Sequence, residues 1–251
     1  MREEKIKNAI KAGIAITILI ITIVMVITIM MQYDKEGEKN IPFEISKITI
    51  ISTADVTEVK QEGEENNNSW NLNVIQNNDI YFSINKNQNY EKEELIKSIT
   101  IENINVTEGP KVGNIETYMP NSLEGRIFNY SNDFKVDESL KYNGANKSNT
   151  KTLDVGNQGG NILISFCNTG LGTYNAESDT EIKHDASLIS KMGKTNEDLK
   201  FKVSFDVIIE LQKKSYKTTI TLNLPCDELI EKGTSTREIT NFDEIIFKRV
   251  N

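Results

Sequence analysis

A run of twenty uncharged, mostly apolar residues lies near the N-terminus, from Ala12 to Met31. At about 1.5 Å of rise per residue, a helix of this length spans about 30 Å, the thickness of the hydrocarbon core of a bilayer. Because lipid offers no partner to peptide groups, a segment placed there forms a helix in spite of its many β-branched residues. Residues 12–31 are therefore predicted to be a transmembrane helix whose partner is the lipid bilayer.

The charges on the two sides of this run predict its orientation. Four cations precede it and two follow it closely, namely Arg2, Lys5, Lys7 and Lys11, then Lys35 and Lys39. Since cations beside a span stay on the cytoplasmic side, residues 1–11 are expected in the cytoplasm and the C-terminal domain outside the cell. A cleaved signal peptide has a shorter apolar core and small residues before the cut, whereas this run ends in Met30 and Met31, so we expect a retained signal anchor.

The remaining chain divides into a short linker and a large domain. Residues 32–40 are polar and charged, which predicts a short tether that holds the domain close to the membrane. Residues 41–251 have the length of one large β-sandwich. A polar, asparagine-rich loop at 142–152 is the candidate boundary if this region consists of two smaller sandwiches, and that alternative stays open. Two similar loops, Lys60–Ser69 and Asn175–His184, are either spacers or the binding edge of a rigid sheet.

Alternation of apolar and polar residues dominates the sequence after residue 41. It is clearest in residues 199–211 and 216–224, which are separated by four polar residues and predict a long antiparallel hairpin. Further strands are predicted at Phe43–Thr53, Trp70–Ile75, Ile80–Ile84, Ser98–Val106, Gly113–Tyr118, Ile162–Cys167 and Glu244–Phe247. The predicted fold class is mainly β, with an antiparallel β-sandwich ectodomain preceded by one transmembrane α-helix.

Two of the predicted strands change the parity of their apolar residues midway. Phe43 and Ile45 are followed by Ile48, and Ile101 is followed by Ile104, which predicts a β-bulge in each strand. Helix is expected only as a turn or two at 91–96 and as a short helix that begins at Asp185 and ends at Gly193.

The charge balance limits the possible partners. Without its first eleven residues the chain holds 25 Lys and Arg against 35 Asp and Glu. Proteins bind nucleic acid mainly by neutralising its phosphates with basic side chains, so an acidic domain disfavours a nucleic-acid partner.

The two cysteines, Cys167 and Cys226, do not have matching positions on their predicted strands. Cys226 continues the inward-facing register of Leu222 and Leu224, whereas Cys167 lies on the face opposite Phe166. This mismatch gives no support for a disulfide, although both a bridge and two free thiols remain open.

Motifs that carry chemistry are sparse. The single histidine, His184, lies in a charged loop, and scattered Cys and His residues do not match a zinc site. The segment Asp154–Asn161 offers oxygen ligands and glycines but lacks the terminal bidentate acid of a calcium loop. Glu177, Asp179 and Glu181 are further acids, so metal binding is left as unknown. No catalytic residue and no cofactor are assigned.

Three segments, Asn157-Gln158-Gly159-Gly160, Leu224-Pro225 and Phe247-Lys248-Arg249, resemble uncharacterised single-pass, envelope-anchored β-rich proteins of low-GC Gram-positive bacteria. The resemblance covers most of the chain after Asn40. It implies a bacterial envelope protein and no known activity.

These observations favour a membrane-anchored, extracytoplasmic binding or interaction protein of the cell envelope, not an enzyme. Its partner would be another envelope protein or a cell-wall ligand. Two alternatives stay open. An extracytoplasmic carboxylate-based hydrolase predicts a deep cleft with two or more acids of raised pKa, whereas a binding module predicts a shallow face or an exposed edge. A subunit of a secretion or pilus-like assembly would pack its helix against copies of itself.

Overall fold

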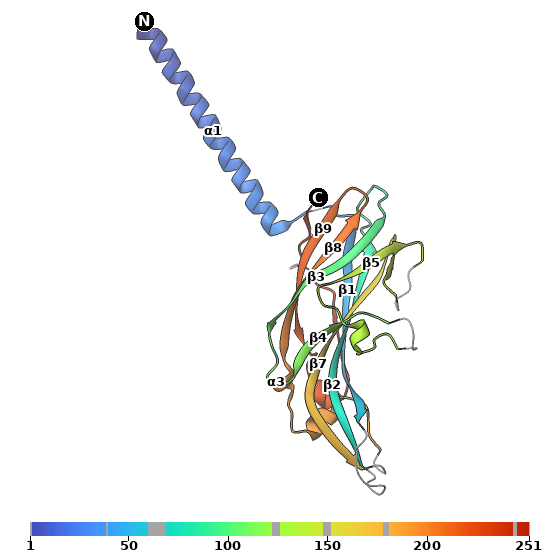
Figure 1. The fold of residues 1–251 in the computed structure, drawn as a ribbon. Coiled ribbons are helices and arrows are strands. Elements are labelled where there is room, and N and C mark those ends of the chain that lie inside the picture. The colour runs from blue at the N-terminus through green and yellow to red at the C-terminus, as the bar shows by residue number, and fades with distance from the viewer. Residues whose placement is uncertain are drawn as a thin grey trace.

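The computed structural model describes residues 2–38, 40–59, 69–121, 126–147, 152–177, 181–242 and 245–250. It consists of a long N-terminal helix, α1 (Arg2–Glu36), and an elongated domain built from two β-sheets that face each other (Figure 1). Short helical turns occur at η1 (Asn132–Phe134), α2 (Ser187–Lys191), α3 (Asn196–Leu199) and α4 (Leu229–Lys232). The predicted mainly-β fold with one N-terminal apolar helix is confirmed.

The sheets differ in length. Sheet A has the order β10-β1-β2-β7-β4, with strands Ser235–Ile239, Phe43–Val59, Ser69–Lys86, Gly159–Glu177 and Asn114–Tyr118. Sheet B has the order β11-β9-β8-β3-β5-β6, with strands Lys248–Arg249, Ser215–Leu224, Phe201–Leu211, Ile96–Glu108, Ser139–Ala145 and Asp154–Gly156. All described pairs are antiparallel except β5 with β6. Both sheets take strands from either side of residues 142–147, so the described strands on the two sides of this segment share one sandwich.

The strongest local patterns predicted the observed elements. The hairpin of β8 and β9 pairs Phe201 with Leu224 and Glu210 with Ser215. The register shifts between Ile45 and Lys47 in β1 and between Glu102 and Asn105 in β3 confirm both predicted bulges. At the second bulge Asn103 has a φ of 54°, a left-handed conformation that asparagine tolerates better than most residues.

Other predictions of elements were wrong or incomplete. Residues 91–95 form neither helix nor strand, and β5, β6 and β10 were not predicted. Residues 245–247 are not a strand; pairing begins at Lys248 instead, and Glu244 lies outside the described residues, as do 60–68, 148–151 and 178–180. Residues Gln32–Glu36, within the expected tether, continue α1.

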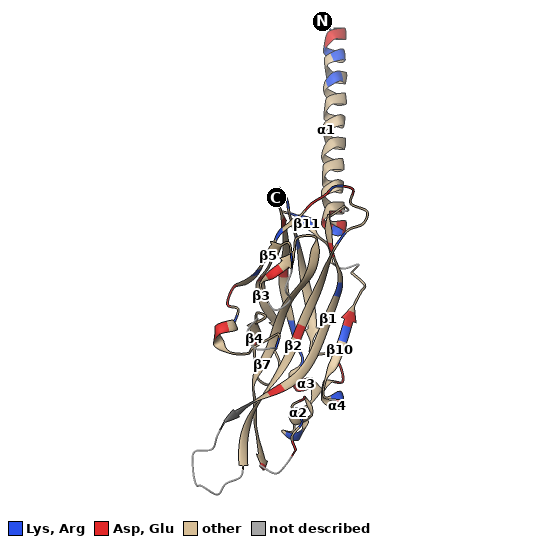
Figure 2. Cartoon of the chain, turned by 90° about the vertical axis from the view of Figure 1, so that its right-hand side faces the viewer, with Lys and Arg blue, Asp and Glu red and all other residues tan. Residues whose placement is uncertain are grey.

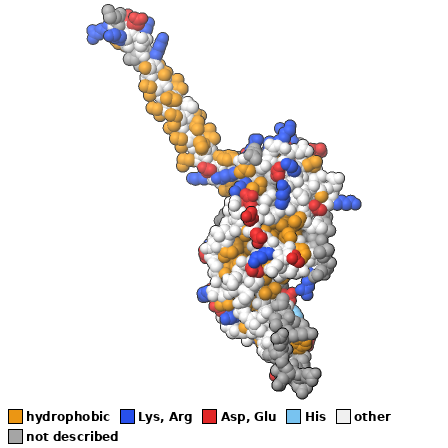
Figure 3. Space-filling view, in the orientation of Figure 1, with side chains coloured by type: hydrophobic (Ala, Val, Ile, Leu, Met, Phe, Trp, Pro, Cys, Tyr) orange, Lys and Arg blue, Asp and Glu red, His pale blue; other side chains and the backbone are white. Residues whose placement is uncertain are grey.

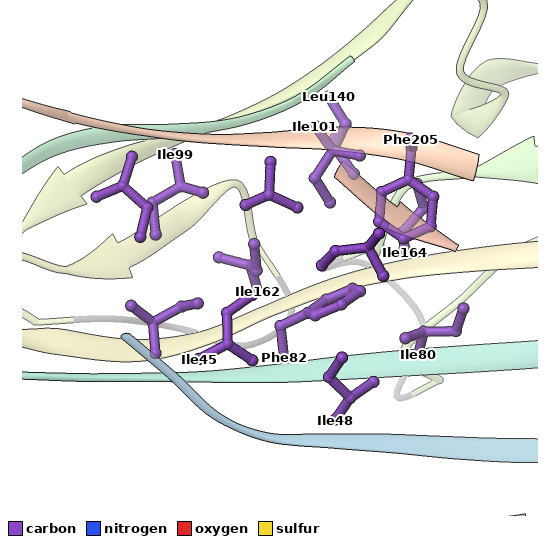
Figure 4. Packing of buried hydrophobic residues seen from close by; sticks show 14 of the residues in the cluster. Ile45, Ile48, Ile80, Phe82, Ile99, Ile101, Leu140, Ile162, Ile164 and Phe205 are labelled. Carbon is purple, nitrogen blue, oxygen red and sulfur yellow. The ribbon is translucent and has the colours of Figure 1, made fainter. Parts of the chain in front are cut away.

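The main core lies between the sheets. Figure 4 shows inward-facing side chains of sheet A, such as Ile80 and Phe82, meeting Ile101 and Phe205 of sheet B. The ring of Phe205 packs edge-on against Phe82 and stacked against Phe166, each at a centroid distance of 5.9 Å. Each fully buried side chain of this size contributes about 1.5–3 kcal/mol through removal of apolar surface from water. This burial holds the two sheets together.

A second apolar cluster covers the lower half of sheet A, where sheet B has ended. There Ala54 of β1, Val74 of β2 and Leu171 of β7 pack against α2 and α4, which Figure 2 shows beside the end of the sheet far from α1. Short helices thus replace sheet B as the cover of this half.

A belt of buried polar side chains separates the two clusters. Asn78 and Gln76 of β2 exchange reciprocal amide hydrogen bonds of 3.2 and 3.0 Å, and Ser52 of β1 donates to Asn78 Oδ1 at 2.8 Å. Asn78 also donates to the carbonyl of Phe166, and the backbone N–H of Cys226 donates to Ser52 Oγ. The polar stretch that the sequence presented as a gap between two strands is therefore the satisfied middle of one strand, β2.

We predict that Asn78→Ala lowers the free energy of unfolding by about 3 kcal/mol, because it leaves buried groups of Ser52 and Gln76 without a partner. The matched control is Asn73→Ala, which removes an exposed asparagine from the same strand and is expected to change stability by less than about 0.5 kcal/mol. Urea unfolding of the two purified variants measures both values. Equal losses would contradict a stabilising role of the belt.

The helix α1 is joined directly to the last strand of sheet B. Tyr33 Oη accepts a hydrogen bond from the Arg249 N–H at 2.9 Å, Lys248 Nζ lies 2.9 Å from Asp34 Oδ1, and the Glu38 N–H donates to the Phe247 carbonyl at 2.8 Å. Gly37, at φ 65°, makes the turn, and a Cβ there would lie 2.4 Å from the Phe247 oxygen. The last turn of α1 is thus fixed against the domain.

Candidate functional site

The residues singled out from the sequence do not come together. His184 is exposed, with Nδ1 3.8 Å from Asp55 Oδ1, and Glu181 is exposed in the same segment. Asp179 lies outside the described residues. Among the residues that the structure describes, no group of three His, Cys, Asp or Glu side chains could hold a metal ion.

The segment Asp154–Asn161 forms β6, a turn and the start of β7. Two of its oxygens are engaged within the fold: the Asn157 carbonyl accepts from the Ile96 N–H at 2.9 Å, and Asn161 Oδ1 accepts from Ser83 Oγ at 3.0 Å. The segment therefore connects the two sheets.

The cysteines are both free and buried. Cys167 Sγ lies 3.2 Å from Asn77 Oδ1, whereas Cys226 Sγ lies 3.6 Å from the Ile50 carbonyl. Burial raises the pKa of the Cys167 thiol, and nearby carboxylates including Glu116 and Asp79 raise it further, which disfavours the reactive thiolate.

Among the acids that the structure describes, Asp79 has a raised pKa. Asp79 of β2 is half-buried, and its Oδ1 accepts hydrogen bonds from Ser165 Oγ at 2.7 Å and Tyr130 Oη at 2.9 Å. Removal from water raises the pKa of Asp79, and these two bonds do not offset it. Burial and the charge of Asp79 also raise the pKa of Tyr81 to about 12. Tyr130, which donates to Asp79, packs edge-on against Tyr118 at a centroid distance of 5.3 Å.

We predict that Asp79→Asn raises the free energy of unfolding at pH 7 by about 1 kcal/mol, the usual size of a single-site effect. Because the folded-state pKa of Asp79 is raised, its ionisation destabilises the fold as pH rises from the unfolded-state pKa through the folded-state pKa. In Asp79→Asn, the amide oxygen accepts the same two hydrogen bonds, from Ser165 and Tyr130, and the side chain carries no charge. Urea unfolding measures this gain, which is expected to vanish below the ordinary pKa of aspartate. A gain that grows toward low pH would contradict the assignment.

The side of the sandwich between β9 and β10 is open. A slot there has a volume of about 440 Å³ and is lined by Ile48, Thr219, Ile220, Thr221, Leu222, Ile239, Asn241 and Ile245. We call these residues the edge slot. Its floor is apolar because Ile48, Ile220 and Leu222 are inward-facing core residues, whereas Thr219 and Thr221 are exposed at its rim. The hollow thus reaches the edge of the core, whose three side chains there are themselves buried.

Further hollows continue the edge slot in both directions. Toward α1 lies a hollow of about 550 Å³ that shares Ile245 and includes the acids Glu36, Glu38 and Glu44. At the other end, a hollow of about 390 Å³ includes Lys200, Lys202 and Arg237 together with Glu108 and Asp227. The three hollows differ in charge, with acids near α1, neutral residues in the middle and mostly cations at the far end.

An ion-pair network on the outer face of sheet B fixes the residues beside the edge slot. Asp206 of β8 accepts hydrogen bonds from Thr219 Oγ1 at 2.5 Å and Asn103 Nδ2 at 2.7 Å, and Lys217 Nζ lies 2.7 Å from its Oδ2. Burial acts to raise the pKa of Asp206, but these bonds outweigh it and the pKa is lowered. Because Asp206 belongs to β8, Lys217 is drawn away from the open side of β9.

The rest of this outer face is mixed. Figure 3 shows hydrophobic, acidic and basic side chains close together on the domain, whereas the middle of α1 is almost continuously hydrophobic, with charges at its two ends. Among the described helices, α1 is the one long and apolar enough to cross a membrane.

Comparisons of the chain with protein-family models, with curated proteins and with solved structures find no match. The edge slot was not predicted from the sequence. Its residues come from β1, β9, β10 and the segment after β10, and β10 itself carries no alternation that would have predicted it.

Proposed function

We propose that this chain is a membrane-anchored binding protein of the bacterial cell envelope, which holds a partner protein at the edge slot outside the cytoplasm. The observation that carries the proposal is the slot itself: a hollow of about 440 Å³ at the side of the sandwich, with an apolar floor and exposed threonines at its rim. Apolar hollows with a few polar groups at the rim are the usual form of recognition sites.

Two further observations support recognition over hydrolysis. In the described part of the chain, Asp79 is the acid with a raised pKa, and it is hydrogen-bonded to Tyr130 and absent from the lining of the edge slot. The slot contains no charged side chain among its described lining residues. A carboxylate-based hydrolase needs two acids facing a substrate.

The membrane part of the proposal rests on α1. Its apolar run has the length of a bilayer core, and the helix is exposed along that run. Thr17, Thr22 and Thr28 donate their hydroxyls to helix carbonyls four residues earlier, at 2.8–2.9 Å, so they present no unsatisfied donor to lipid.

We predict that the full-length chain stays in the membrane pellet after carbonate washing. We also expect protease added to intact cells with an exposed membrane surface to digest the C-terminal domain, because the cations before residue 12 retain the N-terminus inside. Immunoblotting with tags at each end measures both results. Release by carbonate, or a protected C-terminal tag, would contradict the anchor or its orientation.

We predict that a photo-crosslinking amino acid at Thr221, on the rim of the edge slot, forms a discrete adduct with one partner protein in living cells. The matched control is Lys141, an exposed residue of β5 on the same sheet, beyond β8 and β3. Immunoblotting for the tagged chain detects the adduct. Equal crosslinking from both positions, or none from Thr221, would contradict the proposed site.

A further inference from the structure

The outward-facing peptide groups of β9 divide into three parts. At the end of β9 that begins with Ser215, β11 pairs with β9 so that Lys248 lies opposite Lys217. The Val250 N–H donates to the Ser215 carbonyl at 2.9 Å. At the other end of β9, near Leu224, Arg237 Nη2 donates to the Asn223 carbonyl at 2.6 Å. Alternate residues of an antiparallel strand face the same neighbour, so Thr219 and Thr221 face the same side as Ser215, Lys217 and Asn223.

In the described part of the chain no strand pairs with Thr219 or Thr221 on this side. Their N–H and C=O groups form the unoccupied centre of an edge whose two ends are occupied. Five residues, 218–222, lie between those ends, which corresponds to about 17 Å of strand.

This stretch lacks the usual protection of a sheet edge. Natural edges carry lysine, proline or a bulge that prevents pairing with another chain. Residues 218–222 contain none of these, and the nearby Lys217 is bonded to Asp206 on the neighbouring strand. An unprotected edge beside a hollow with an apolar floor favours a partner strand.

Pairing of β9 with β9 of a second copy is obstructed in this structure. Antiparallel pairing of two β9 strands about Ile220 places Asn223 of one copy opposite Lys217 of the other, where Lys248 already lies. Pairing about Thr221 instead places Thr219 opposite Asn223, whose carbonyl is already bonded to Arg237. A foreign strand of about five residues meets neither obstacle.

We therefore propose, resting on the proposed function, that the partner supplies a short extended peptide segment that adds antiparallel to β9 between β11 and Arg237. Its alternate side chains are aliphatic and enter the edge slot against Ile48, Ile220 and Leu222, and the intervening ones are small and polar, beside Thr219 and Thr221. Main-chain hydrogen bonds give affinity and the slot gives sequence preference, as in other strand-addition complexes.

The test uses the full-length protein in detergent and a labelled pentapeptide, Val-Thr-Val-Thr-Val, which matches residues 218–222 in length, with fluorescence polarisation as the readout. In an antiparallel pair the peptide residues opposite Thr219 and Thr221 turn both their backbone groups to β9 and their side chains outward. Methylation of the threonine amides is expected to weaken binding at least tenfold, whereas methylation of the valine amides changes it less than about threefold.

Variants of the protein give the reciprocal test. Thr221→Pro removes one outward N–H that the described fold does not use, and is expected to weaken the unmodified peptide about tenfold or more. Thr221→Val retains that N–H and is expected to bind within about twofold of the wild type. Unfolding midpoints show whether each variant is folded. If the proline variant does not fold, the methylated peptides on the unaltered protein decide alone.

Antiparallel strand addition would be overturned if the peptide showed no saturable binding or if the two methylation patterns had equal effects. It would also be overturned if only methylation of the valine amides weakened binding. Dimerisation of the free chain that the peptide does not reverse would assign the edge to a second copy and also overturn it. A partner crosslinked at Thr221 together with any of these results would leave the binding function in place and refute only the strand mode.

Discussion

Contact between the inward-facing side chains of the two sheets is the interaction on which the rest of the structure depends. Phe205 lies at its centre, between Phe82 and Phe166 of the opposite sheet. Because alternate residues of a strand face opposite sides, this packing fixes which residues of β8 and β9 face outward and thus places Asp206 and Thr219 on the outer face of sheet B. The open side is equally a product of this packing, since the sheets meet face to face and are not closed at their β9 and β10 edges.

Much of the fold could be predicted where a local pattern was strong. The twenty-residue apolar run, the alternation in β8 and β9 and the parity changes at Ile45 and Ile101 each determine a local structure without help from distant residues. Asp185 was predicted to cap a short helix ending at Gly193; the helix is α2, Ser187–Lys191, and its N-cap residue is Ala186, although Asp185 Oδ1 does accept the Ser187 N–H at 2.8 Å.

Elements that depend on distant partners could not be predicted in the same way. The polar residues Gln76 and Asn78 interrupt the apolar pattern of β2, yet the strand continues because Ser52, the Phe166 carbonyl and each other satisfy their amides. Strand β10 has few apolar residues and forms because its backbone pairs antiparallel with β1. The edge slot combines residues separated by up to about two hundred positions, so only the assembled sandwich brings them together.

The attachment of α1 to β11 has a mechanical consequence. Tyr33 and Asp34 in the last turn of α1, and Glu38 just after it, hold residues 247–249 at three points, which restricts rotation of the helix relative to the sandwich. If α1 crosses a bilayer as proposed, the domain keeps a constant height above the lipid and turns only when the helix turns. Ligands anchored in the same leaflet would then meet the protein by lateral diffusion, a two-dimensional search that favours segments displayed at that one height.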